Sequence, residues 1–230
     1  MLTLAFDTSS RTAAVAVLRD DTILYDSVIN TGLNHSETLM PEIDYALRQV
    51  RIKISDINLF ACTIGPGSFT GLRIGVSTLK GLMMATGTPA TGVSSLAAVA
   101  LNPGTTSKTI CSMIDAGRGQ VYVSQFRYDD NNILQQISEE KAVSPTEIFN
   151  SIDGNTLFVG DGVIKYAEII NNIKPRVFIA SDLQHHIRAF AVGILGQKKF
   201  AENDLLDAST LVPFYLRSAD AVPHKSIFET

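Results

Sequence analysis

Apolar and polar positions alternate from the first residues of the chain, which predicts that it begins with a β-meander. Leu2, Leu4 and Phe6 form the apolar set of the first strand, and the polar run 7–10 ends it. The pattern then predicts further strands over 12–18, 23–29 and 59–64, helices over 36–50 and 69–86, and a short strand leading to Gly92. Ser36 is the expected N-cap of the first helix.

The same order of elements begins again in the second half of the chain. Turn-forming residues gather at 101–107, and beyond them Asp115 follows a strand as Asp7 does. The expected elements are strands over 109–114, 120–127, 133–138 and 156–159 and helices over 145–150, 163–171 and 183–198. We therefore predict an α/β protein with a duplicated βββαβα unit in two lobes. The alternative is that aspartate recurs only because hairpin turns favour it.

This pattern predicts three parts of the chain. We expect a first lobe over residues 1–103 and a smaller second lobe over 104–182. Residues 183–230 are expected to form a helix, packed back on the first lobe, and an irregular tail.

The composition indicates a large core and a surface with few charges. Of 230 residues, 45% are hydrophobic and only 18% are charged, against about 25% in typical domains. The 19 basic residues do not outweigh the 23 acidic ones, and the formal charge is −4. Autonomous binding of nucleic acid is therefore not expected. The lack of charge also predicts that a partner covers part of the surface.

Compartment and membrane association follow from local sequence features. Cys62 and Cys111 each lie in an apolar run and are expected to be buried thiols in a reducing environment. Residues 1–7 lack the basic start of a signal peptide, and no apolar run is long enough to span a bilayer. The expected location is the cytoplasm.

The duplicated unit, with an aspartate at the first turn of each half, resembles the actin-like ATPase and sugar-kinase (ASKHA) superfamily. There the two turns grip nucleotide phosphates from opposite sides. The resemblance implies phosphate-binding turns built from Asp7, Thr8, Ser9, Asp115 and Arg118, with an adenosine-binding turn at Gly160, Asp161 and Gly162. The second turn lacks a glycine run followed by threonine, so two structural turns in a degenerate site are the alternative.

Other catalytic and metal motifs are missing from the sequence. The loop 65–71 lacks a phosphate-binding lysine, and Ser68 fits an N-cap better than a nucleophile. The histidines His35, His185, His186 and His224 are never three or four residues apart, so no metal site is expected.

The helix expected over 69–86 is apolar around most of its circumference. Its small residues Gly71, Gly75, Ser77 and Gly81 would let another backbone approach closely, and the 36–50 helix is the expected neighbour. Two interpretations stay open: a fully buried core helix, or one of a helix pair that presents an apolar face to a partner protein.

Several motifs in order identify the sequence as similar to the TsaB (YeaZ) family, most strongly over residues 1–125. They are Asp7-Thr8-Ser9, His35-Ser36-Glu37-x-Leu39-Met40-Pro41, Gly65-Pro66-Gly67-Ser68-Phe69-Thr70-Gly71-Leu72-Arg73-Ile74-Gly75, Gly92-Val93-Ser94-Ser95-Leu96, Asp115-Ala116-x-Arg118 and Pro213-x-Tyr215-Leu216-Arg217.

The resemblance implies a non-catalytic partner subunit in threonylcarbamoyladenosine synthesis on tRNA. Its implied partners are a TsaD-like catalytic subunit and a TsaE-like ATPase, with tRNA reached only through the complex. It implies no tightly bound cofactor and no metal here, and ATP only at the level of the complex. It leaves open whether that nucleotide touches this chain and whether the isolated chain is a homodimer.

The resemblance also implies where the partner docks, namely on the two N-terminal helices. The implied interface residues are His35, Glu37, Leu39, Met40, Ile43, Leu47, Phe69, Leu72, Arg73, Val76, Leu79 and Met83. One departure is Gly117, where the family commonly has a second basic residue. The alternative functions are an actin-like ATPase or kinase using Asp7 and Asp115 and, more weakly, a peptidase.

Overall fold

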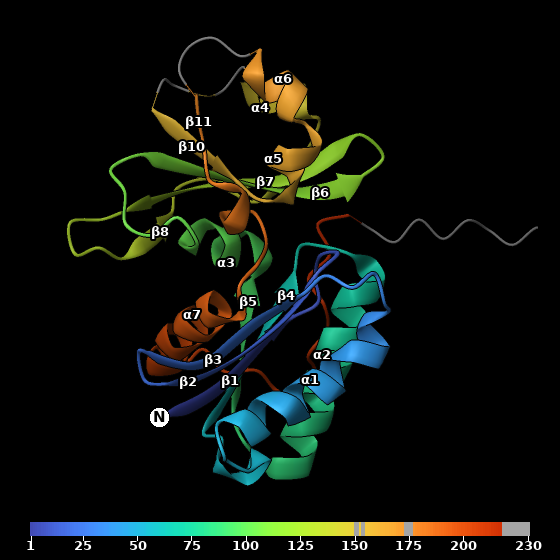
Figure 1. The fold of residues 1–230 in the computed structure, drawn as a ribbon. Helices are drawn as coiled ribbons and strands as arrows, with labels where there is room; N and C mark the ends of the chain where they lie inside the picture. The colour runs from blue at the N-terminus through green and yellow to red at the C-terminus, as the bar shows by residue number, and fades with distance from the viewer. Residues whose placement is uncertain (150–151, 153–154, 173–176, 218–230) are drawn as a thin grey trace, which may run out of the picture.

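The computed structural model describes residues 1–149, 152, 155–172 and 177–217, and its strands form two sheets at the centres of two lobes (Figure 1). The first sheet has the order β3-β2-β1-β4-β5, with β1 (Leu2–Asp7), β2 (Ala13–Arg19), β3 (Thr22–Ile29), β4 (Leu59–Gly65) and β5 (Ala90–Ser94). The second has the order β8-β7-β6-β10-β11, with β6 (Thr109–Gly117), β7 (Gln120–Tyr128), β8 (Leu134–Gln136), β10 (Thr156–Val159) and β11 (Val177–Ile179). A further strand, β9 (Lys141–Val143), pairs with β7.

The two sheets are built alike, which confirms the predicted duplication. The central strands β1 and β6 each pair antiparallel with the next strand in sequence, β2 and β7. On their other side they pair parallel with β4 and β10, the strands reached through helical crossovers. Asp7 and Asp115 therefore lie near the ends of equivalent strands, as the sequence predicted.

The described helices are α1 (His35–Gln49), α2 (Phe69–Thr86), α3 (Ser95–Leu101), α4 (Pro145–Phe149), α5 (Asp161–Lys165), α6 (Ala167–Asn171) and α7 (Ala189–Ala201). Short 3-10 turns cover Ile54–Asp56 and Asp182–Gln184. The bounds of α2 are those predicted, and the Ser68 hydroxyl caps it by accepting from the N–H of Gly71 at 3.3 Å. A left-handed Gly87 ends it.

Several predicted boundaries are wrong, each because a contact distant in sequence decides where the element ends. Asn34, not Ser36, precedes α1, and Nε2 of His35 at the first helical position donates to the carbonyl oxygen of Ser10 at 2.8 Å. The 183–198 helix begins only at Ala189, because the Asp26 carboxylate accepts the N–H of Phe190 at 3.2 Å.

The second lobe has shorter elements than the sequence pattern predicts. The 163–171 helix is two helices, α5 and α6, and the 133–138 strand is reduced to β8. In the 145–150 helix, the expected last residue lies outside the described residues. The short elements α3, β9 and β11 were not predicted, because a segment of three to seven residues carries too little periodicity to identify it.

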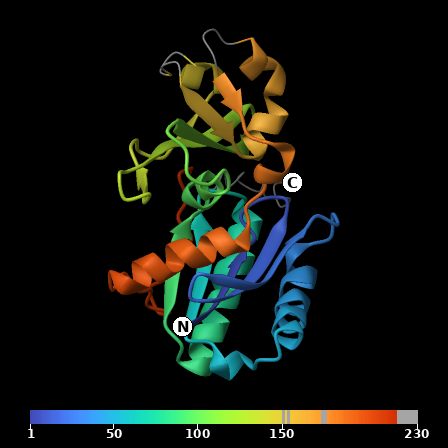
Figure 2. The same ribbon diagram turned by 60° about the vertical axis from the view of Figure 1, so that its left-hand side comes forward.

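The first sheet is covered on both faces, and its strands alternate accordingly. Leu4, Phe6, Val15 and Val17 lie in the cluster with α1 and α2, whereas Ala5, Ala14, Ala16 and Ala61 lie in the cluster with α7. Helix α7 follows the second lobe in sequence, yet it packs on β1, β2, β4 and β5. Figures 1 and 2 show it on the side of the first sheet away from α1 and α2.

Both cysteines are free, buried thiols, as expected, and they lie in different lobes. Burial raises the pKa of Cys111 to about 12. Within the described part of the chain, no helix combines the length and apolar character needed to cross a bilayer.

Candidate functional site

A cavity of about 670 Å³ lies between the two lobes, where the first turns of both sheets face each other. Its walls come from the β1–β2 turn, the loop before α2, the β6–β7 hairpin and the segment 215–217. Of the predicted phosphate-turn residues, it is lined by Ser9, Asp115, Arg118 and Asp161, but not by Asp7, Thr8, Gly160 or Gly162. The structure thus brings only half of the predicted set to the cavity.

Asp7 is fully buried below the first turn. Its Oδ1 accepts hydrogen bonds from the N–H of Ser9 at 3.0 Å, from the Ser9 hydroxyl at 2.6 Å and from the Thr63 hydroxyl. Its Oδ2 is buried and has no hydrogen-bond partner among the residues that the structure describes. Burial raises the pKa of Asp7 above its usual value of 3.8, more than these hydrogen bonds lower it. The carboxyl group therefore fixes the turn from the inside.

The rest of the first turn is packed against the start of α2. The Thr8 hydroxyl donates to the carbonyl oxygen of Gly71 at 2.8 Å. The N–H of Ser68 donates to the carbonyl oxygen of Ser9 at 2.7 Å. A Cβ at Gly71 would lie 2.0 Å from the Thr8 carbonyl oxygen, and one at Gly75 would lie 2.5 Å from the Thr8 hydroxyl. Gly71 and Gly75 therefore admit the β1–β2 turn, not the neighbouring helix that the sequence favoured.

The second turn carries an ion pair. Lys165 of α5 donates to both carboxylate oxygens of Asp115, at 2.9 and 2.7 Å, and this hydrogen bond raises the pKa of Lys165. The N–H of Asp115 donates to Asp161 Oδ1 at 2.9 Å. Burial raises the pKa of Asp161. The two aspartates are thus held within the second lobe by their own neighbours.

The predicted adenosine turn is a close contact with the backbone of β6. Gly160 has φ 115°, and a Cβ there would lie 2.0 Å from the carbonyl oxygen of Met113. Its N–H donates to Nδ1 of His185 at 3.2 Å, and burial lowers the pKa of that histidine. Gly160 therefore turns the chain sharply from β10 into α5.

Residues 211–217 form a strap, a feature that the sequence pattern did not predict. The N–H of Phe214 donates to the carbonyl oxygen of Ile64 at 2.7 Å, and Tyr215 stacks on Phe69 with ring centroids 4.9 Å apart. Figure 1 draws the strap in red beside β4 and α2, rising toward the space between the lobes. The only sequence signal was the motif ending in Tyr215-Leu216-Arg217.

The strap also reaches the second lobe. Arg217 donates to the carbonyl oxygen of Ala116 at 3.2 Å and to Gln120 Oε1 at 3.3 Å. Tyr215 accepts from Arg73 Nε of α2 at 3.3 Å. One short segment therefore connects the outer side of α2 with the β6–β7 hairpin.

Six of the twelve predicted interface residues lie in the hydrophobic core of the chain. Their side chains are at most 8% exposed: Leu39, Ile43, Leu47, Leu72, Val76 and Leu79. His35, Phe69 and Met83 are half-buried, and the exposed members are Glu37, Met40 and Arg73. Any direct contact with a partner must use these outer residues, because the first six already cover the sheet.

The outer side of α2 is a row of exposed residues, the middle two of which are short. Arg73, Ser77, Gly81 and Met84 follow one another at helical spacing, and Met84 is 79% exposed. A hollow of about 450 Å³ lies beside this row, between its first two turns and Ser36 of α1. This α1–α2 face offers both an apolar projection and a recess.

Metal-ligating side chains do not gather in the described part of the chain. No three His, Cys, Asp or Glu side chains among the described residues are grouped as metal ligands. The ATPase alternative needs Asp7 and Asp115 to act on one nucleotide, but Asp7 faces the core and Asp115 is paired with Lys165.

Comparison with known proteins connects these features to a family. The family model described as "TsaD: tRNA N6-adenosine threonylcarbamoyltransferase" matches residues 30–223. The tRNA threonylcarbamoyladenosine biosynthesis protein TsaB of Bacillus subtilis (strain 168) is 33% identical over 225 residues, covering 96% of each chain. This chain belongs to the TsaB family. The Escherichia coli TsaB is 31% identical over 70% of this chain and 72% of its own length.

Solved structures agree with the fold of the TsaB family. "YeaZ from Pseudomonas aeruginosa" superposes with a TM-score of 0.77 at 24% identity, covering 94% of this chain and 99% of its own. The ethanolamine utilization protein EutJ from Carboxydothermus hydrogenoformans has a TM-score of 0.52 at 9% identity, covering 85% of this chain and 90% of its own. The predicted actin-like fold is confirmed.

Proposed function

We propose that this member of the TsaB family is a non-catalytic subunit in the synthesis of N6-threonylcarbamoyladenosine at position 37 of tRNAs reading codons that begin with A. The observation that carries the proposal is the 33% identity, over almost the whole length of both chains, to a TsaB protein. The inward-facing Asp7 and the paired Asp115 support a role other than phosphoryl transfer.

The α1–α2 face is the proposed docking surface for a TsaD-type catalytic subunit. Its exposed Met40 and Met84 provide apolar contacts, and the short residues Ser77 and Gly81 allow a partner helix to approach closely. A second copy of the chain would compete for the same face in isolation. A TsaE-type ATPase joins the assembled pair, and tRNA is bound through the complex, consistent with the charge of −4.

Substitution of an exposed residue tests the docking surface without disturbing the core. Ser77→Arg places a long cation in the middle of the outer row of α2, so we expect it to abolish co-purification with the TsaD-type subunit of the same organism. Ala201→Arg is the matched control, because it is an exposed helical position on α7, on the opposite face of the first sheet. If both variants capture the TsaD-type subunit equally, that subunit does not dock on the α1–α2 face.

The function itself is tested in cells. Depletion of this chain should lower the amount of N6-threonylcarbamoyladenosine measured by mass spectrometry of digested tRNA. Wild-type chain and Ala201→Arg should restore the modified nucleoside, whereas Ser77→Arg should not. An unchanged level after depletion would refute the proposed function, whatever the docking result.

A further inference from the structure

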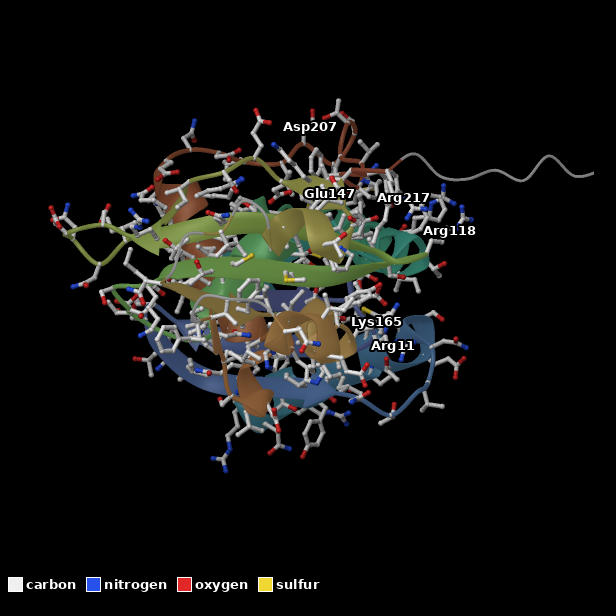
Figure 3. All side chains as sticks on the ribbon, turned by 90° about the horizontal axis from the view of Figure 1, so that it is seen from above. Arg11, Arg118, Glu147, Lys165, Asp207 and Arg217 are labelled. Atoms are coloured by element: carbon white, nitrogen blue, oxygen red, sulfur yellow. The ribbon has the colours of Figure 1, made fainter. Side chains whose placement is uncertain are left out.

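The strap is held on the first lobe by its backbone. The N–H of Phe214 donates to the carbonyl oxygen of Ile64, and a Cβ at Gly65 would lie 2.1 Å from the carbonyl oxygen of Phe214. A side chain at position 65 would therefore displace the strap. Figure 3, which looks down on the molecule, shows Asp207 before the strap and Arg217 at its end along one outer edge. The strap is thus a fixed part of the surface of the folded chain.

Side chains of the strap alternate between the interior and the solvent. Leu211 is buried in the cluster with α1 and α2, and Tyr215 stacks on Phe69. Val212 and Phe214, which lie between Leu211 and Tyr215 in sequence, are 69% and 46% exposed. Grouped apolar side chains at a surface, unlike scattered ones, mark a site of interaction. The two exposed side chains therefore form an outward apolar pair on a backbone that is already fixed.

Tyr215 connects this apolar pair to the outer side of α2. Its hydroxyl accepts from Arg73 Nε at 3.3 Å, and the Arg73 guanidinium group lies 3.8 Å from the centre of the Phe69 ring. Phe69 and Arg73 also line the hollow beside the outer row of α2. The strap and the α1–α2 face therefore meet at the first turn of α2 and form one continuous surface.

Arg73 indicates the charge of the group that fits beside the apolar pair. Its side chain is exposed, and within the described residues no carboxylate pairs with it. Stacking on Phe69 and the bond to Tyr215 restrict its rotamers, so little side-chain entropy is lost when it binds a partner. A guanidinium group pairs with both oxygens of a carboxylate. Arginine and aromatic side chains also contribute most of the binding energy at protein interfaces.

We propose that the strap is a second docking element for the TsaD-type catalytic subunit. The subunit places an apolar side chain on Val212 and Phe214 and a carboxylate on Arg73. This inference rests on the proposed function and deepens it, because it extends the docking surface beyond helices α1 and α2. Tyr215 is a positioning residue, which holds Arg73 for the contact with the carboxylate. A second copy of the chain is the competing occupant.

Isothermal titration of the full chain with the TsaD-type subunit of the same organism tests the proposal. Phe214→Glu and Val212→Glu should each weaken binding by about tenfold or more, because each places a carboxylate in an apolar contact. Ile23→Glu is the matched control, because Ile23 is 47% exposed and lies on β3, which two strands separate from β4. Its affinity should equal that of wild type.

The charged part of the contact is tested through its dependence on salt. Arg73→Gln should weaken binding by about tenfold and make it less sensitive to salt, whereas the exposed Arg19→Gln at the end of β2 should do neither. Tyr215→Phe keeps the stacked ring and removes the hydroxyl, so its smaller loss of affinity should vanish when Arg73 is already glutamine. A purely structural role of Tyr215 would give the same loss with and without Arg73.

Failure of this proposal differs from failure of the proposed function. If wild type binds the subunit and both strap variants bind as tightly as Ile23→Glu, the strap is not a docking element, although the function stands. If wild type itself does not bind the subunit, both proposals are wrong. If Phe214→Glu abolishes only self-association in sedimentation, the occupant is a second copy and the proposal is overturned. Thermal unfolding of each variant shows that its fold is retained.

Discussion

The substitution Gly71→Ala isolates the contact between α2 and the β1–β2 turn. The new Cβ would lie 2.0 Å from the Thr8 carbonyl oxygen, whereas unstrained contacts begin near about 3.5 Å. The turn must move by more than about 1 Å, which strains the bonds from Thr8 to Gly71 and from Ser68 to Ser9. Each bond is worth about 1 kcal/mol, and overpacking adds about 1–3 kcal/mol. We therefore expect a loss of about 3 kcal/mol after the gain in helix propensity is subtracted.

Urea denaturation followed by far-ultraviolet circular dichroism measures this loss. At a slope of about 2 kcal/mol per molar urea, 3 kcal/mol lowers the midpoint by about 1.5 M. Gly81→Ala is the matched control in the same helix, because a Cβ there meets no atom of the described residues within 4 Å. It should stabilise the chain by about 0.5–1 kcal/mol. If Gly71→Ala raises the midpoint as Gly81→Ala does, the close approach of the turn is not what requires glycine.

Two further predictions concern buried charge. Val76→Glu buries an unpaired carboxylate at a position 3% exposed, so it should lower the free energy of unfolding by more than about 3 kcal/mol. The exposed Ser77→Glu should change that free energy by less than about 0.5 kcal/mol. Equal melting temperatures of the two variants would contradict this orientation of α2. Burial raises the pKa of Asp7 in the folded chain. The contribution of Asp7 to stability is therefore present at pH below its pKa in the unfolded chain and is lost as the pH rises through its pKa in the folded chain. The stability of wild type relative to Asp7→Asn should therefore fall as the pH is raised above about 4, and a constant difference in urea unfolding would refute the assignment.

Much of the fold could be predicted because the first half has long and strongly patterned elements. The α2 bounds follow from Ser68 and Gly87, which stop a helix at each end by local hydrogen bonding. The duplication followed from the repeated order of strands and helices. The start of α7 could not be predicted, because it depends on Asp26, more than 160 residues away in sequence.

The candidate site was only partly predictable for the same reason. The pattern identified both turns but not which side chains face the cavity, so Asp7 was expected at a phosphate and is instead buried beneath the turn. Lys165, which is bonded to Asp115, and Arg217, which is bonded to the β6–β7 hairpin, were not singled out. No local pattern relates residues on three segments that meet only after the lobes and the strap have packed.

Periodicity, caps and motifs are local properties, so they indicated the two repeated units, the α1–α2 pair and the family. The orientation of α2, in contrast, depends on its packing. A helix that is apolar around most of its circumference has no single face marked for burial, and packing in one cluster with the first sheet buries Val76 and Leu79. The opposite side, from Arg73 to Met84, remains at the surface because the β1–β2 turn occupies the side of Gly71 and Gly75. The cavity likewise exists only through the packing of two lobes and a strap.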